Sequence, residues 1–121
     1  MSVLAAILVA STSLHITAWP NGQGHTPRRS YTLTCAAPVG GTLPNRLAAC
    51  RKLYALKAPF APTRKDLVCT EIYGGPEEAL VTGRFRGRLI RASFSRKDGC
   101  EIGRWARVAF LFPGVSSANS R

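Results

Sequence analysis

Four widely spaced cysteines, Cys35, Cys50, Cys69 and Cys100, constrain the fold of this 121-residue chain more than any other feature. They form no C-x-x-C pair, and no histidine follows them at the spacing of a zinc ligand, so the sequence argues against a metal site. An even number of spaced cysteines favours two disulfide bonds and hence an oxidising compartment. Four cysteines can pair in three ways, and their spacing alone selects none of them.

Length and composition indicate one folded domain that carries a large positive charge. Hydrophobic residues make up 45% of the chain, enough for a core in a domain of this size. Seventeen Lys and Arg residues against six Asp and Glu residues give a formal net charge of +11. Such a charge suits an acidic partner such as nucleic acid, but a solvated basic surface is the more common explanation. Charge alone therefore identifies no site.

The start of the chain, MSVLAAILVA, is apolar but too short to span a bilayer. It is similar to the apolar part of a signal peptide, although no basic residue occurs before Arg28. We interpret residues 1–10 as a shortened leader of a secreted protein; the alternative is that they begin the fold. Residues 11–112 then form the domain, and the small polar residues 113–121 are expected to be a flexible tail.

Most of the domain has the pattern of an antiparallel sheet. Residues 19–29 are rich in Gly and Pro and would join the first two strands as a hairpin. Alternating or continuous apolar patterns predict strands at residues 11–18, 30–35, 79–83, 84–94 and 105–112.

One helix is predicted over residues 45–58, before a proline-rich segment that ends it. Its apolar positions fall near one face, and its basic residues lie mostly outside that face. These positions are Leu47, Cys50, Leu53, Tyr54 and Leu56. A sheet with one main helix against it belongs to the α+β class.

No part of the chain has the pattern of a catalytic centre. The two histidines, His15 and His25, fall in a predicted strand and in a glycine-rich turn, and no G-x-S-x-G motif is present. The six acidic residues are scattered, and a disulfide-bonded cysteine cannot act as a nucleophile. We therefore predict that the protein is not an enzyme and needs no cofactor.

The segment GRFRGRLIRASFSR at residues 83–96 offers an alternative function. Its arginines alternate with Phe85 and Phe94, as in proteins that hold phosphates and stack bases. A half-buried strand whose inward residues are Phe85, Leu89 or Ile90 has the same pattern, and no RNA-binding motif accompanies it. The alternative is thus a basic extracellular module that uses the strand Arg84–Arg96 to bind an anionic partner such as nucleic acid.

The segment LVCTEIYGGP at residues 67–76 has an unusual composition. A cysteine is followed by polar and β-branched residues, then by a tyrosine, two glycines and a proline. A disulfide beside an exposed, extended segment would reduce the entropy lost when the segment binds a protease active site. It would also hold the chain in place if a bond in the segment were cut. An ordinary loop beside a structural disulfide is the commoner arrangement.

Taken together, residues 11–112 resemble the Streptomyces subtilisin inhibitor family of secreted protease inhibitors. YTLTCAAPVGGTLPNRLAAC (31–50) resembles its first disulfide segment, VCTEIYGGP (68–76) its reactive-site segment, and DGCE and VAFLF its ending. The resemblance implies a five-stranded antiparallel sheet with one main helix, and room for a short second one, on one face. It also implies a homodimer packed through the sheets.

The same resemblance implies the disulfides Cys35–Cys50 and Cys69–Cys100. By loop-closure entropy the first would stabilise the fold by ~3 kcal/mol and the second, with its longer loop, by ~3.6 kcal/mol.

Carried over by position, the resemblance places the scissile bond between Glu71 and Ile72. Glu71 would enter the specificity pocket of a serine protease. Members of the family bind as substrates do: the loop lies over the catalytic serine, is hydrolysed very slowly and religates. Backbone contacts would resemble strand addition. The remaining residues of the protease-binding loop would be Cys69, Thr70, Tyr73 and Gly74.

The residue Glu71 departs from the family, which usually has Met or Lys at this position. A carboxylate in an apolar pocket costs several kcal/mol, and in a trypsin-like pocket it meets an Asp of like charge. We therefore expect poor inhibition of trypsin. The expected partners are subtilisin-like proteases with a polar-tolerant pocket or glutamate-specific serine proteases.

Two further departures lie close to this bond. Where the family has Tyr-Asp-Pro, this chain has Tyr73-Gly74-Gly75-Pro76, and the extra glycine is expected to loosen the loop. Asp98 stands where the family has an Asn that supports the loop from below. An ionised Asp can accept hydrogen bonds there but cannot donate them.

Overall fold

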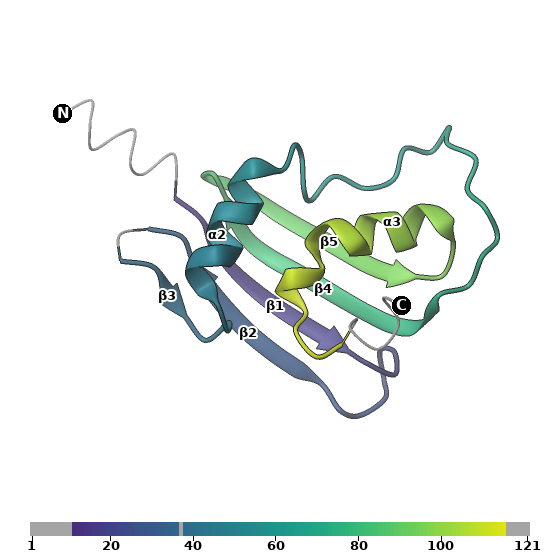
Figure 1. The fold of residues 1–121 in the computed structure, drawn as a ribbon, viewed down its shortest axis with the longest axis horizontal. Coiled ribbons are helices and arrows are strands. Elements are labelled where there is room, and N and C mark those ends of the chain that lie inside the picture. Colours follow the sequence, from purple (N-terminus) through teal and green to yellow (C-terminus); the bar gives the residue numbers. More distant parts are fainter. Residues whose placement is uncertain (1–10, 37, 116–121) are drawn as a thin grey trace.

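The chain folds into one antiparallel sheet covered by helices on one face (Figure 1). The structure, a computed structural model, describes residues 11–36 and 38–115. The strand order is β3-β2-β1-β4-β5, and every neighbouring pair is antiparallel. In chain order the elements are β1 (Ser13–Trp19), β2 (Arg29–Thr34), β3 (Gly40–Gly41), α2 (Arg46–Ala55), β4 (Gly75–Phe85), β5 (Arg88–Arg96), α3 (Gly99–Val108) and the 3₁₀ turn η1 (Ala109–Leu111). The predicted α+β class and five-stranded sheet are confirmed.

Alternation along the strands decides which face of the sheet is buried. In β1, Leu14 and Ile16 are 2% and 0% exposed, whereas Ser13 before them and His15 between them are exposed. The predicted hairpin of the first two strands is confirmed, since Ile16 of β1 pairs with Tyr31 of β2. A period of two places alternate side chains on opposite faces, so the helices cover only the apolar one.

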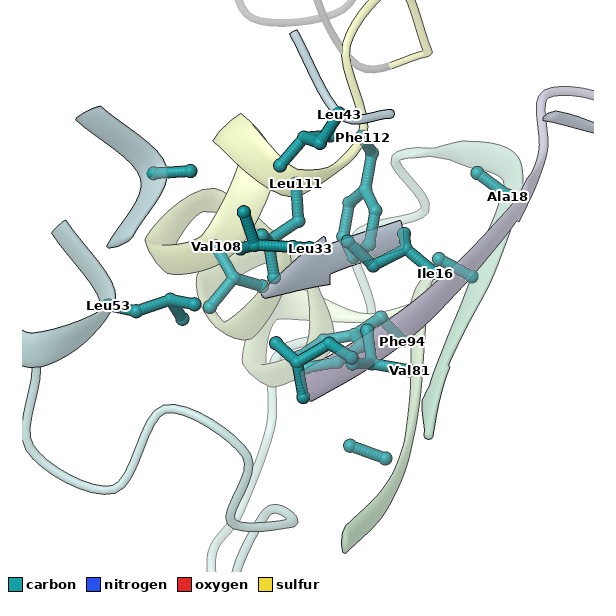
Figure 2. Packing of buried hydrophobic residues seen from close by; sticks show 14 of the residues in the cluster. Ile16, Ala18, Leu33, Leu43, Leu53, Val81, Phe94, Val108, Leu111 and Phe112 are labelled. Atoms are coloured by element: carbon teal, nitrogen blue, oxygen red, sulfur yellow. The ribbon is translucent and has the colours of Figure 1, made fainter. Parts of the chain in front are cut away.

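The core lies between this apolar face and the C-terminal helical region (Figure 2). Phe112 packs against Phe94 of β5 with ring centroids 5.6 Å apart and against Trp105 of α3 at 4.7 Å. All three rings are at most 2% exposed. Truncating such a buried ring to alanine typically costs 3–5 kcal/mol. The core continues beyond Phe112, because Val115 is only 4% exposed.

The predicted strand at 105–112 is wrong, because this segment is the end of α3 followed by η1. The buried positions Trp105, Val108, Leu111 and Phe112 recur at helical spacing, and Arg107 between them is exposed. The short apolar run hid this periodicity in the sequence. The second helix therefore has ten residues, as many as α2.

The predicted single strand at 84–94 is also wrong, because the chain reverses within it. Arg86 and Gly87 have φ angles of 53° and 83°, the left-handed pair that suits a tight hairpin turn. β4 therefore ends at Phe85 and β5 begins at Arg88.

The predicted helix at 45–58 is shorter, since α2 ends at Ala55 and Leu56 is extended. Two of its predicted apolar positions, Leu47 and Tyr54, are 54% and 37% exposed. The residues that α2 buries are Ala49, Cys50 and Leu53.

Both ends of the chain lie outside the described residues. This applies to the expected leader at 1–10 and to residues 116–121 of the expected tail. Among the residues described, no helix has the length and apolarity needed to cross a membrane.

Candidate functional site

A long connection without helix or strand, residues 56–74, leads from α2 to β4 beside α3 (Figure 1). Its later part presents large apolar side chains to solvent. Val68 is 95% exposed, Ile72 61% and Tyr73 68%. Neighbouring exposed apolar side chains on a small protein often mark a binding surface.

The first part of this connection is attached to α3 by polar side chains. Arg107 Nη2 donates a hydrogen bond to the Lys57 carbonyl at 2.6 Å, and Arg104 Nε donates one to the Ala61 carbonyl at 3.1 Å. The Thr63 hydroxyl donates to Glu101 Oε2 at 2.9 Å. These bonds fix the path of the chain before it reaches the predicted reactive segment.

A disulfide and a backbone hydrogen bond hold the start of the reactive segment. Cys69 is bonded to Cys100 in the first turn of α3, with the two Cα atoms 5.3 Å apart. The Gly99 N–H donates to the Thr70 carbonyl at 2.9 Å. A Cβ atom on Gly99 would collide with Thr70 Oγ1, so glycine allows this approach without a change in the Thr70 side chain. Two residues before Glu71, the chain is thus joined to α3.

The end of the segment also has backbone contacts, at its two glycines. The Gly74 N–H donates to the Arg96 carbonyl at 2.7 Å, and Gly75 pairs with Arg96 at the start of β4. A Cβ atom on Gly74 would lie 2.9 Å from Ile102 Cδ1 of α3. The two glycines therefore let the chain pack against its neighbours, whereas the loosening of the loop expected from them stays a prediction.

The carboxylate of Glu71 differs from the other five carboxylates of the chain. Glu71 is exposed and has no hydrogen bond or ion pair with any described residue. The other five have partners: Asp66 with Arg64, Glu77 with Arg96, Glu78 with the Gln23 N–H, Asp98 with the Glu101 N–H, and Glu101 with Arg104. The Glu71 carboxylate is therefore available to a cation or hydrogen-bond donor of a binding partner.

One carboxyl group has a clearly shifted pKa. The hydrogen bond from Arg64 lowers the pKa of Asp66, since the guanidinium favours the charged form. Both side chains are exposed, at 74% and 70%, so this pair adds little to stability.

Asp98 begins α3 as its N-cap. Its Oδ1 accepts a hydrogen bond from the Glu101 N–H at 2.9 Å. The hydrogen bond therefore stabilises the first turn of α3, which carries Gly99 and Cys100. Asp98 thus fixes the two residues that contact Thr70 and Cys69. Cys69, Asp98 and Cys100 lie close together, but both sulfurs are in the disulfide and offer no thiolate to a metal.

The aromatic residues of the alternative nucleic-acid surface are not free to stack on bases. Phe94 is 2% exposed, and Phe85 packs against Phe60 and Tyr54 with centroids 5.2 and 5.7 Å away. Arg96, at the end of the same segment, is 8% exposed. The surface therefore keeps exposed arginines but lacks the base-stacking platform.

The structure shows that Gly99 and Arg96 contact the predicted loop, although the sequence did not single them out. A glycine directly before a cysteine is a signal of close backbone approach and could have identified Gly99. Arg96 had no such signal, because its burial depends on which strand pairs with β5.

Comparisons with known proteins support the family resemblance. A sequence profile described as subtilisin inhibitor-like matches residues 10–97. "Subtilisin inhibitor-like protein 5" of Streptomyces fradiae is 35% identical over 89 residues, which cover 72% of this chain and 82% of that protein. "Kexstatin-1" of Streptomyces platensis is 29% identical over 113 residues, covering 87% and 75%.

Among solved structures, the chain is similar to Streptomyces caespitosus sermetstatin, crystallised in complex with Bacillus licheniformis subtilisin. The TM-score is 0.52 at 25% identity, and the match covers 84% of this chain and 94% of sermetstatin.

Proposed function

Since the chain belongs to the subtilisin inhibitor-like family, we propose that it is a secreted serine-protease inhibitor whose reactive bond is Glu71–Ile72. One observation carries the assignment of this bond. The chain is held two residues before Glu71 by the Cys69–Cys100 disulfide and two residues after Ile72 by Gly74, while the side chains between these points are exposed.

Such a segment suits binding in the manner of a substrate. Because its ends are already fixed, little conformational entropy is lost when an extended strand forms against the protease. Once the bond is cut, both new ends stay near the catalytic serine, so the amine of Ile72 can attack the acyl-enzyme again. Slow net hydrolysis follows from this geometry.

The target is set by Glu71 in the primary specificity pocket. Its carboxylate has no partner among the described residues and would need a cation or donors in the pocket. A trypsin-like pocket carries an Asp and repels it. We therefore propose glutamate-specific serine proteases or subtilisin-like proteases with a polar-tolerant pocket; the likeness to an inhibitor crystallised with subtilisin supports the second class.

Secretion and dimerisation form part of the same proposal. Both disulfides suit an oxidising compartment. The face of the sheet opposite the helices carries the exposed residues Ser13 and His15 and is proposed to pack against a second copy. His15 lies on this face between Thr32 and Thr82, so the contact would be polar. Sedimentation equilibrium measures whether the dimer forms.

The proposed function is tested by titrating residual protease activity with the oxidised protein. Subtilisin, trypsin and a glutamate-specific serine protease are the three targets. Stoichiometric loss of activity of the first or third enzyme is expected, with slow appearance of a cut between Glu71 and Ile72. Rapid cleavage, or no effect on any of the three, would contradict the proposal. Inhibition that persists as salt rises separates it from binding of a polyanion, which salt weakens strongly.

A further inference from the structure

A buried arginine lies against the leaving side of the loop. Arg96, the last residue of β5, is 8% exposed, and its Nη1 donates a hydrogen bond to the Gly74 carbonyl at 2.6 Å. The same atom lies 3.6 Å from Oε1 of Glu77, which is 4% exposed. Arginine is almost never buried without a partner, so this contact is a specific one.

Arg96 holds Gly74 through its backbone as well as through its side chain. Its carbonyl accepts the Gly74 N–H at 2.7 Å, so one residue satisfies both backbone groups of Gly74. The pairing of β4 with β5 is irregular here, with a register shift between Gly75 and Glu78. The guanidinium thus provides a contact at a point where the regular ladder is interrupted.

We infer that Arg96, oriented by Glu77, is a positioning residue for religation of the Glu71–Ile72 bond. This inference rests on the proposed function. Gly74 lies two residues after Ile72, just as Cys69 lies two residues before Glu71. The disulfide holds the acyl end of a cut loop, and Arg96 holds the amine end.

The step itself is balanced without any further reactant. In cleavage, the protease serine oxygen bonds to the Glu71 carbonyl carbon, the C–N bond breaks, and the Ile72 amine takes a proton. In religation the neutral amine attacks the ester carbon, the C–N bond forms, and the serine oxygen leaves and takes a proton back. Religation outcompetes hydrolysis only while the amine stays near the ester, which is the role we assign to Arg96.

Arginine suits this role better than lysine. Its planar guanidinium presents several donors in a fixed geometry, so it can donate to the Gly74 carbonyl and form an ion pair with Glu77 at the same time. Lysine offers a point charge on a flexible stem and would hold Gly74 less firmly.

The test uses a double variant, Arg96→Met with Glu77→Met. Replacing both partners avoids an unpaired buried charge, so the fold is expected to persist. With the glutamate-specific serine protease, cleavage at Glu71–Ile72 should be about 10- to 100-fold faster than in the wild type, the effect of losing one charge-assisted hydrogen bond. Conversion of purified cut inhibitor back to the intact form should fall equally, whereas the association rate should not change. The single variant Arg96→Lys, which keeps Glu77, should lose less religation than the double variant.

The matched control is Arg64→Met with Asp66→Met, which removes an exposed ion pair from the chain on the other side of the disulfide. Its cleavage and religation should match those of the wild type. Equal behaviour of the folded Arg96→Met/Glu77→Met variant and the wild type would overturn the inference.

A second measurement needs no protease. Hydrogen exchange of the Gly74 amide should be about 10- to 100-fold faster in the Arg96→Met/Glu77→Met variant, and unchanged exchange would also overturn the inference. If the wild-type protein inhibits none of the three proteases, the proposed function fails and the religation role fails with it. Hydrogen exchange then shows whether the side chain of Arg96 restrains Gly74, so the two failures are distinguishable.

Discussion

The two disulfides have similar Cα–Cα distances but lie in contrasting surroundings. Their Cα–Cα distances are 5.7 Å for Cys35–Cys50 and 5.3 Å for Cys69–Cys100. The first joins the chain just after β2 to α2, where Cys50 is 8% exposed and belongs to the hydrophobic core. The second joins α3 to a loop in which Val68 is 95% exposed.

The contrast separates stabilising a fold from shaping a binding loop. Around Cys50, buried side chains such as Leu53 would keep much of the arrangement in place without the covalent bond. Around Cys69, few side chains are buried, so the disulfide and a few hydrogen bonds determine where the loop lies. The same chemical bond is therefore expected to serve stability in one region and inhibition in the other.

The largest expected effect comes from removing each disulfide in turn. Cys69→Ala with Cys100→Ala should turn the protein into a rapidly cleaved substrate and weaken inhibition by at least about 100-fold. Cys35→Ala with Cys50→Ala should lower the free energy of unfolding by about 2–5 kcal/mol, while the folded protein still inhibits. Thermal unfolding and protease titration measure the two effects. Equal loss of inhibition in both variants would break the comparison.

Charge reversal should act in the loop region only. Glu71→Lys replaces repulsion with attraction in a trypsin-like pocket and should gain inhibition of trypsin by about 100-fold or more, the size of a charge-pair effect of a few kcal/mol. It should lose inhibition of the glutamate-specific protease. Arg51→Glu, an exposed reversal in α2 next to Cys50, is the control and should leave both inhibition constants unchanged. A Glu71→Lys variant without activity against trypsin would contradict the placement of the scissile bond.

Substitutions at Gly74 and at Gly103 distinguish close packing from simple flexibility. Gly74→Ala places a Cβ atom 2.9 Å from Ile102 and should destabilise the protein by about 1–3 kcal/mol and speed loop cleavage. Gly103→Ala in α3 meets nothing within 4 Å and should stabilise the helix by about 1 kcal/mol. Denaturant unfolding gives both numbers. A neutral or stabilising Gly74→Ala would show that the loop end is mobile.

The smallest effect is expected at Asp98. Asp98→Ala removes the cap of α3 and should cost about 1 kcal/mol, whereas Asp98→Asn keeps an acceptor and should cost a few tenths. Because α3 carries Cys100, cleavage of the loop should speed up slightly in the alanine variant alone. Amide exchange in the first turn of α3 checks the cap directly. If both variants exchange alike, the cap does not support the loop.

Local patterns predicted the elements whose contacts are local. The hairpin of β1 and β2 followed from alternation and a glycine-rich turn. The strand predicted at 105–112 was wrong because eight largely apolar residues fit both a strand and a buried helix. In the folded protein Trp105 packs against Phe112 and Phe112 against Phe94, contacts that no local pattern in the sequence shows.

The candidate site was predictable in part for the same reason. Cys69 and Glu71 lie within one short segment, so the resemblance could place them. Arg96 comes 22 residues after Gly74, and its contact depends on the pairing of β5 with β4. The expected loosening by glycine considered the loop alone and took no account of the side chain of Ile102 beneath it.

The sequence by itself determined the α+β class and the alternation of the sheet, and through its resemblance the cysteine pairing; it also led to the prediction that Glu71 is offered to the protease pocket. These follow from periodicity and from motifs that lie within single segments. The tertiary structure decided which groups hold the loop: the Gly99 amide, the Ile102 side chain and the buried Arg96–Glu77 pair. They come from separate segments that meet only when the register of β4 and β5 and the docking of α3 are set, and no local pattern encodes that register.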